Sequence, residues 1–127
     1  MSAHVTVTPQ LRTTNLEATL DFYINTLGME LDFRYEDFYA GIRAGNQQIQ
    51  FKLVDDPDPS IAFVREGDHL HLYFRVSDVD SYAAELKAKD VSFRHELAEK
   101  PWGAREFAIE DNQGHILYFA QDEESAS

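Results

Sequence analysis

One short pattern occurs twice in the chain, and this internal repeat restricts the fold more than any other feature of the sequence. The segment from Arg12 to Leu16 reads Arg-Thr-Thr-Asn-Leu, and the segment from Arg75 to Val79 reads Arg-Val-Ser-Asp-Val. In each copy a strand-like segment leads to a good helix-capping residue and then to apolar residues at helical spacing. Each copy ends in a turn and another strand-like segment, so the order β-α-β-β-β occurs twice.

The repeat predicts one helix in each half of the chain. The first helix begins after Asn15 and runs to about Leu27, where Gly28 ends it by adopting left-handed backbone angles at little cost. The second follows Ser77 and Asp78. Apolar residues recur at helical spacing in both segments. They are Leu16, Leu20, Tyr23, Ile24 and Leu27 in the first helix, and Val79, Tyr82, Ala83 and Leu86 in the second.

Strands are predicted between and around these helices. The segments that read as strands are 29–35, 38–44, 47–54, 69–76, 91–97, 104–110 and 115–121. Pro9 interrupts the expected first strand, because proline lacks the N–H that a strand ladder needs. We therefore predict one domain over residues 1–127. Its parts are a first repeat at about 4–54, a turn-rich linker at 55–68, a second repeat at about 69–121 and a tail at 122–127.

The predicted fold class is α+β, with two βαβββ repeats that form a cupped mixed sheet and helices outside. Alternation along a strand assigns side chains to faces. Ile49 and Phe51 are expected to pack under a helix, while Gln48 and Gln50 point into the cavity that the cup encloses. A plain α+β sandwich without a repeat is the alternative.

The composition excludes several functions. The chain has 11 basic and 23 acidic residues, a formal net charge of −12, which disfavours nucleic acid because its phosphates need Lys and Arg. There is no cysteine, so disulfides and thiolate zinc sites are excluded. No apolar run is long enough to span a membrane, and the first residues do not resemble a secretion signal, so a cytoplasmic location is expected. The acidic excess permits a cationic ligand, although it also serves solubility.

Several segments resemble the glyoxalase/bleomycin-resistance/dioxygenase (vicinal oxygen chelate) superfamily. Residues 15–28 resemble its opening helix, and residues 71–80 resemble its fifth strand entering the second helix. Residues 101–111, which begin Pro-Trp-Gly, are similar to the bleomycin-binding resistance proteins, as are Asp32-Phe33 and the stretch 36–41. The resemblance covers nearly the whole chain, from about Val7 to Gln121.

The resemblance also implies where a metal would be held. Enzymes of the superfamily use four cavity-facing side chains on the first and last strands of each half. Carried onto this chain, the four positions are Thr8, Gln50, His71 and Tyr118. Only His71 is a good ligand for a divalent metal, because the others are neutral donors or a phenol. We therefore expect no metal and no cofactor.

A planar, cationic ligand is what the resemblance suggests instead. Trp102 stands next to Gly103, and aromatic faces both stack on flat molecules and attract cations. In the resistance branch the aromatic residues at the positions of Phe38 and Trp102 are implicated in stacking on bleomycin. The alternative is that both side chains are hydrophobic plugs. The acids expected to attract the cation are Asp32, Glu36 and Asp37, and Phe33 beside them is also expected to contact the ligand. The cavity is expected to be lined by Gln50, His71, Tyr73 and Tyr118.

The leading hypothesis is a binding protein that sequesters a bleomycin-like glycopeptide without changing it. The resemblance further implies a homodimer in which Pro9 is the hinge for exchange of the N-terminal strand, the alternative being a monomer with a bulge at Pro9. Two rival functions remain open. One is a sensor or carrier for another planar molecule, and the other is a glyoxalase- or dioxygenase-like metalloenzyme that uses His71.

Overall fold

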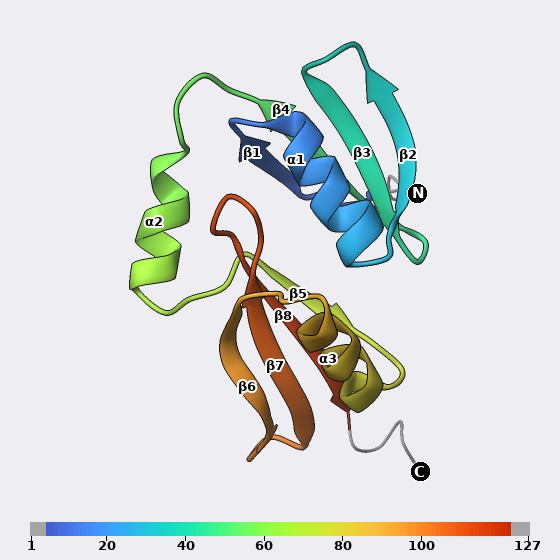
Figure 1. Cartoon of the computed structure of the whole chain (residues 1–127), viewed down its shortest axis with the longest axis vertical. Helices are drawn as coiled ribbons and strands as arrows, with labels where there is room; N and C mark the ends of the chain where they lie inside the picture. The colour runs from blue at the N-terminus through green and yellow to red at the C-terminus, as the bar shows by residue number, and fades with distance from the viewer. Residues whose placement is uncertain (1–4, 123–127) are drawn as a thin grey trace. The chain divides into compact units, whose positions relative to one another are not determined.

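Each half of the chain forms a four-stranded mixed sheet with a helix packed on one face, as the computed structural model in Figure 1 shows. The structure describes residues 5–122. The chain divides into two compact units, one ending at Asp58 and one beginning at Pro59. The elements of the first unit are β1 (Gln10–Thr13), α1 (Leu16–Asp21), the π-helical turn η1 (Phe22–Thr26), β2 (Glu30–Tyr35), β3 (Tyr39–Ala44) and β4 (Gln47–Leu53).

The second unit repeats this order after one additional helix. Its elements are α2 (Pro59–Glu66), β5 (Leu72–Arg75), α3 (Val79–Ala88), β6 (Phe93–Lys100), β7 (Ala104–Glu110) and β8 (Ile116–Asp122). The strand orders are β1-β4-β3-β2 and β5-β8-β7-β6. In both sheets the first strand runs parallel to the last, and the other pairs are antiparallel. The α+β class and the duplicated βαβββ order are therefore confirmed.

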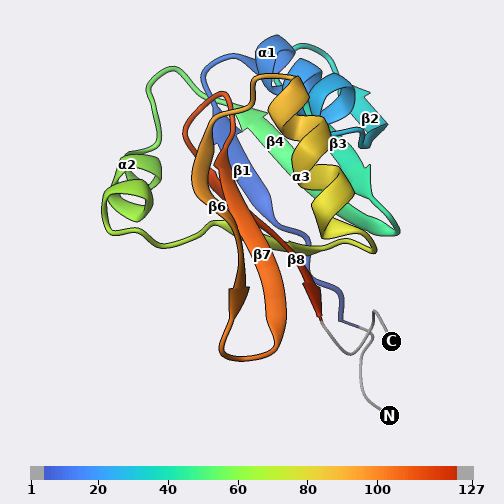
Figure 2. The ribbon, with the colours of Figure 1, turned by 60° about the horizontal axis from the view of Figure 1, so that its bottom comes forward.

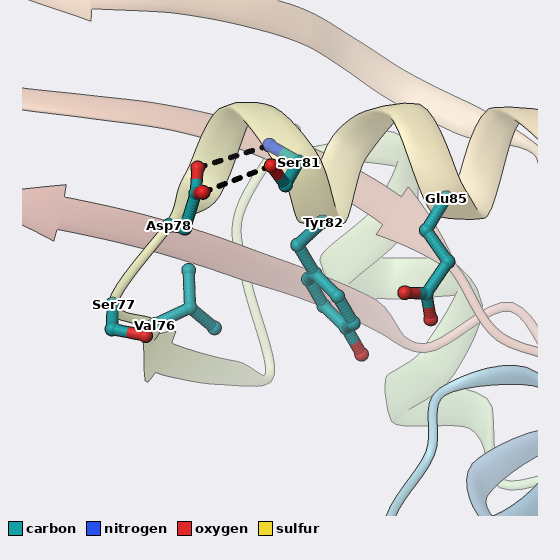
Figure 3. Close-up of a pocket in the computed structure, with 6 residues that line it drawn as sticks. All are labelled: Val76, Ser77, Asp78, Ser81, Tyr82 and Glu85. Carbon is teal, nitrogen blue, oxygen red and sulfur yellow. Dashed lines mark hydrogen bonds between the residues drawn. The ribbon is translucent and has the colours of Figure 1, made fainter.

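Side-chain caps fix where the two repeated helices begin. The Asn15 side chain accepts the Ala18 N–H across 3.0 Å at the start of α1. At the start of α3, Asp78 accepts the backbone N–H of Ser81 at 3.1 Å and its hydroxyl at 2.9 Å, as Figure 3 shows. The two bonds from backbone N–H groups satisfy donors that have no partner inside the helix. Gly28 follows the first helix with φ of +84°, as its predicted role requires.

The apolar core of each unit lies between its sheet and its repeated helix. Ile49 and Phe51 are buried in β4, whereas Gln48 and Gln50 are only half-buried, so the predicted alternation of faces holds. In the second unit Leu86 of α3 is fully buried, as are Phe107 and Phe119, whose rings stack at 5.4 Å. The opposite face of each sheet carries the polar and aromatic side chains considered below.

Three details differ from the sequence predictions. The segment 55–68 was expected to be a linker, but it contains α2, whose Ile61 is buried and whose Arg65 reaches Glu110 at 4.0 Å. Strand β5 is shorter than the predicted 69–76. Pro9 precedes β1 rather than interrupting it, and its carbonyl accepts the N–H of Gln50 at 2.9 Å. Within the described residues, no helix is both long and apolar enough to cross a membrane.

Candidate ligand-binding site

A cavity of about 440 Å³ opens on the sheet face of the second unit that does not carry α3. Strands β5 and β8 contribute its central side chains, and the β6–β7 hairpin and the segment between α2 and β5 contribute the rest. Figure 2 shows this hairpin as the orange ribbon that runs past α3 to the turn at residues 101–103. The lining residues are Asp68, Leu70, Tyr73, His95, Lys100, Trp102, Glu106 and Tyr118.

Aromatic rings dominate one side of this cavity. Tyr73 and Tyr118 are register partners on the parallel strands β5 and β8, and their rings lie 6.2 Å apart with planes only 15° from parallel. The imidazole of His95 lies 6.0 Å from the Tyr118 ring. Trp102 is in the β6–β7 turn and 67% exposed. A side chain that plugs the end of a sheet would be buried, so the exposed indole favours a surface that meets a ligand.

A buried carboxylate lies beside the two tyrosines. Glu106 of β7 is 3% exposed, and the Tyr73 hydroxyl donates a hydrogen bond to its Oε2 across 2.7 Å. Burial, followed by this hydrogen bond, raises the pKa of Tyr73 to about 12. The phenol therefore keeps its proton at neutral pH and remains a donor. Glu106 was missed by sequence reasoning, because alternation places it on the cavity face but gives no sign that it would be buried.

A second carboxylate, that of Asp68, lies at the rim of the same cavity beside two basic side chains. His95 Nε2 lies 2.8 Å from Oδ1 of Asp68, and Arg94 Nε lies 3.7 Å from that oxygen. The bond from His95 is the largest of the interactions that lower the pKa of Asp68. Burial raises the pKa of Tyr118. Asp68 is thus an ionised carboxylate whose charge is already partly neutralised.

The first unit has its own smaller cavity, of about 270 Å³, lined by Gln10, Phe38, Tyr39 and Lys52. Phe38 is 43% exposed, and its ring meets Tyr35 edge to face at 5.6 Å. Phe38 and Trp102, predicted to stack together on a ligand, therefore line different cavities. Lys52 was not predicted as a site residue.

A row of hydrogen-bonded side chains crosses the sheet next to this cavity. The Tyr39 hydroxyl and the Gln10 amide both donate to Oε1 of Gln50. Gln50 donates to Gln48 across 2.7 Å, and Gln48 donates in turn to Asp32. A carboxylate can only accept, so Asp32 sets the orientation of both downstream amides. Asp32 and Gln50, both predicted site residues, are joined through Gln48.

The remaining predicted residues of the first unit lie in and beside the β2–β3 hairpin. Asp37 is exposed and lies 3.5 Å from Arg34, which also pairs with Glu17 of α1. Glu36 has φ of +50°, and its carbonyl accepts from Arg34 Nε at 3.1 Å. Phe33 is the register partner of Gly41, and its ring occupies the space above that glycine. None of these residues lines either cavity described above.

Two of the four positions carried over for a metal lie outside the strands. Thr8 is exposed and comes before β1, where Gln10 is the register partner of Gln50. His71 comes before β5, where Tyr73 is the register partner of Tyr118. Thr8 and His71 are therefore not direct register neighbours of Gln50 and Tyr118.

His71 has a structural role instead of lining the aromatic cavity. Its Nδ1 accepts the N–H of Ile116 at 3.0 Å, and its ring meets His115 edge to face at 4.9 Å. His115 is buried and lies 2.8 Å from the carboxylate of Asp111. This cluster of imidazoles and a carboxylate fixes the turn that leads into β8.

The four side chains at the positions carried over for a metal do not suit a catalytic divalent ion. Thr8 and Gln50 offer a neutral hydroxyl and a neutral amide. Tyr118 is a phenol whose raised pKa keeps it protonated, and Nδ1 of His71 already accepts the Ile116 N–H. Such metals are held by imidazole and carboxylate groups. Over residues 5–122, no three His, Asp or Glu side chains lie close enough together to hold a metal ion.

A third hollow, of about 420 Å³, lies beside α3 and is drawn in Figure 3. Its polar groups include Ser77, Asp78 and Glu85, and Tyr82 forms its apolar side. Burial raises the pKa of Tyr82. The carboxylate of Asp78 is already engaged as the helix cap. We therefore centre the candidate site on the aromatic cavity of the second unit.

Comparison with solved structures places this fold among known relatives. TioX from Micromonospora sp. ML1 matches with a TM-score of 0.74 and 22% identity, over 94% of this chain and 99% of that one. The bleomycin-binding protein from bleomycin-producing Streptomyces verticillus, solved with copper(II)-bleomycin, matches with a TM-score of 0.67 and 25% identity, over 94% and 97%. Lactoylglutathione lyase from Agrobacterium tumefaciens matches with a TM-score of 0.72 and 17% identity, over 94% and 95%.

The family itself is shown by sequence. No curated protein matches the chain in a sequence search. A family model described as Glyoxalase/Bleomycin resistance protein/Dioxygenase superfamily matches residues 2–119, which is almost the entire chain. The resemblance noted in the sequence and the duplicated fold agree with this match. The chain belongs to the glyoxalase/bleomycin resistance protein/dioxygenase superfamily.

Proposed function

We propose that this protein binds and sequesters a bleomycin-like glycopeptide antibiotic without any chemical change to it, and so confers resistance. The observation that carries the proposal is the exposed indole of Trp102 at a cavity lined by the parallel rings of Tyr73 and Tyr118. Flat aromatic groups bind to such surfaces by stacking, with little loss of side-chain freedom.

The relatives support this choice of ligand. The Streptomyces verticillus protein was solved with copper(II)-bleomycin bound, and the present chain is 25% identical to it over nearly its whole length. Members of the same superfamily also include enzymes, so membership alone does not choose between binding and catalysis. The site chemistry therefore has to decide between the two.

The site chemistry favours binding over metal catalysis. Of the residues carried onto the superfamily's metal positions, Thr8, Gln50 and Tyr118 are weak ligands for a divalent ion. Nδ1 of the fourth, His71, already accepts the Ile116 N–H. The cavity of the second unit has acids and an imidazole, but Asp68 and His95 are paired with each other and Glu106 is bonded to Tyr73. We propose no reaction for this site.

Each predicted site residue takes a part in this proposal. Trp102 stacks on the planar portion of the ligand, with Gly103 leaving room beside the indole, and Tyr73 and Tyr118 line the cavity. Phe38 offers a second stacking surface in the first unit. Gln50 presents an amide, and Phe33 fills the space beside it. Asp32, Glu36 and Asp37 supply a long-range negative field, which attracts cations to the surface. His71 supports β8 from outside the cavity.

Calorimetric titration with bleomycin, both metal-free and copper-loaded, tests the proposal. We expect saturable binding at micromolar affinity or tighter, with one drug per chain. Expression in a sensitive bacterium should then protect the cells in proportion to that affinity. No heat at high drug concentration would remove the resistance role and leave the fold and the cavity as described.

A binding protein for another planar molecule is the second candidate, and one observation favours it. Each cavity contains a lysine beside its aromatic rings, Lys52 in the first unit and Lys100 in the second. An ammonium group in such a place would favour a planar ligand that carries an anionic substituent. A thermal-shift screen of aromatic carboxylates and of aromatic amines, run on the same sample, would separate this ligand class from the bleomycin-like one.

We further propose that the protein acts in the cytoplasm as a homodimer with an exchanged N-terminal strand. Pro9 fixes its own backbone angle immediately before β1, which makes the junction a natural hinge. Light scattering after gel filtration should give twice the chain mass of 14.6 kDa. A mass of one chain would remove the exchange and leave the binding proposal to be judged by calorimetry.

A further inference from the structure

Glu106 is a buried carboxylate, and its one polar partner among residues 5–122 is neutral. It is 3% exposed, and the Tyr73 hydroxyl is its one hydrogen-bond partner among the residues that the structure describes. That bond engages Oε2, and the residue lines the cavity. No lysine, arginine or histidine of the described chain forms an ion pair with it.

The neighbouring charges are engaged elsewhere. Arg75, on the same face of the sheet, pairs with Asp122 at 2.6 Å. The acid at the rim, Asp68, is bonded to His95 at 2.8 Å. Lys100 lines the cavity but lies outside ion-pair distance of Glu106. Glu106 is therefore the one carboxylate lining this cavity that has no cationic partner within the described residues.

An ionised carboxylate is costly to bury unless a positive charge or several donors compensate it. Tyr73 contributes one donor and holds its proton up to a pKa of about 12, so it can stabilise the negative charge but cannot neutralise it. The tyrosine rings beside the carboxylate attract cations through their faces, and the Arg75 guanidinium lies 5.8 Å from the centre of the Tyr73 ring. These features match a site that is completed by a positive group from outside the chain.

We propose that Glu106 binds the cationic group of the ligand, an amidinium, guanidinium or protonated amine attached to a planar part that stacks against Tyr73, Tyr118 or Trp102. The inference rests on the proposed function and makes it more specific, because it assigns cation binding to the aromatic cavity of the second unit. The acids of the first unit suit this role less well, since Asp37 already faces Arg34 and Asp32 is bonded to Gln48.

Benzamidine and benzamide form a matched pair of probes for this site. Both are flat and similar in size, and only the first is cationic at neutral pH. Calorimetry or NMR titration of the full chain should show that benzamidine binds more tightly than benzamide. In Glu106→Gln the affinity for benzamidine should fall by about tenfold or more, as expected when a charged hydrogen-bond partner is lost, while benzamide binding is unchanged.

A charge-matched control is available on the same sheet. Glu99 of β6 is exposed, and its neighbour Lys100 points to the cavity, so Glu99→Gln removes one negative charge away from the site. It should leave the preference for benzamidine intact. An equal loss in both variants would overturn the proposal in favour of a diffuse effect of net charge. No loss in Glu106→Gln would overturn it outright.

A measurement on the wild-type chain covers the case in which Glu106→Gln does not fold. The ¹³C resonance of the Glu106 carboxyl carbon should move on addition of benzamidine and stay in place with benzamide. A carboxyl resonance that moves equally with both probes, or with neither, overturns the proposal.

The bleomycin titration separates this inference from the proposed function. If the protein prefers benzamidine through Glu106 but does not bind bleomycin, the cation site stands and the proposed drug-binding function is wrong. If Glu106→Gln changes neither the affinity for bleomycin nor the preference for benzamidine, the drug-binding function stands and the proposed cation site is wrong.

Discussion

The Tyr73 hydroxyl on β5 donates to the Glu106 carboxylate on β7 across 2.7 Å, and β8 lies between these two strands. The bond therefore spans the sheet over the middle strand. It aligns the Tyr73 ring with that of Tyr118, which is its register partner on β8. A residue pair that lies 33 positions apart in the sequence thus shapes the side of the cavity on which a flat ligand would rest.

Tyr73 should ionise at unusually high pH. Burial and the bond to Glu106 raise its pKa to about 12 from an ordinary value near 10. A raised pKa for an acid means that the folded state holds the proton more tightly. The resulting stability is fully present below pH 10 and is lost as the pH rises toward 12. The pKa of Tyr73 can be measured from the phenolate absorbance at alkaline pH, as the difference between wild type and Tyr73→Phe. A difference spectrum that titrates near pH 10 would contradict the raised pKa.

Truncation of Trp102 should reduce binding but not stability. The side chain is 67% exposed, so Trp102→Ala removes little buried area and should leave the melting temperature nearly unchanged. If it anchors the ligand, affinity for bleomycin should fall by about 2 kcal/mol or more, roughly thirtyfold. Phe63→Ala is the control, because Phe63 is 77% exposed on α2 and lines none of the three hollows. Equal losses in the two variants would point to a general surface effect.

Removal of the α3 cap should destabilise the second unit. The Asp78 carboxylate accepts two bonds from Ser81, which also lower the pKa of Asp78. Asp78→Ala should reduce the free energy of unfolding by about 1 kcal/mol, while Asp78→Asn, an equally good cap, should cost less. Urea denaturation at pH 7 compares the two.

The contribution of this cap to stability also has a defined dependence on pH. A carboxyl whose pKa is lowered in the folded state stabilises the protein above its ordinary pKa of 3.8, and this stability is lost as the pH falls through the lowered value. Wild type and Asp78→Ala should therefore converge in acid. A constant difference down to pH 2 would show that the carboxylate charge is not what caps the helix.

The sequence predicted the duplicated fold well because its signals are local. Asn15 and Asp78 cap helices through bonds to residues three positions away, and alternation along β4 follows from strand geometry alone. Helix α2 was missed because only Ile61 of its eight residues is buried, which leaves almost no apolar periodicity to detect. Its packing depends on Arg65, whose partners lie far along the chain.

The site was predicted less completely, since it depends on register between distant strands. A shift of two residues along β1 or β5 keeps every side chain on the same face, so alternation alone does not fix which residue lies opposite Gln50 or Tyr118. Burial of Glu106 in a cavity cannot be inferred from its neighbours in sequence. Trp102 was proposed because a tryptophan beside a glycine in a Pro-Trp-Gly run is visible in the sequence itself.

Gly41 should prove to be coupled to Phe33 across the first sheet. A Cβ added at Gly41 would lie 2.4 Å from Cε1 of Phe33, much closer than carbon atoms approach, so the ring must move away. Gly41→Ala should therefore destabilise the chain by about 1–3 kcal/mol through overpacking. The same change made in a Phe33→Ala background should cost much less, because the ring that blocks the methyl group is gone.

The double-mutant cycle isolates this contact from the intrinsic preference of glycine or alanine for a strand. A coupling free energy of at least about 0.5 kcal/mol between the two positions, measured by urea denaturation, is expected for side chains in contact. Ile42→Val is the control at the adjacent position, since Ile42 is buried on the opposite face and should show no coupling to Phe33. Additive effects of Gly41→Ala and Phe33→Ala would mean that the ring does not rest on the glycine, and the shape assigned to this face of β2 and β3 would then be wrong.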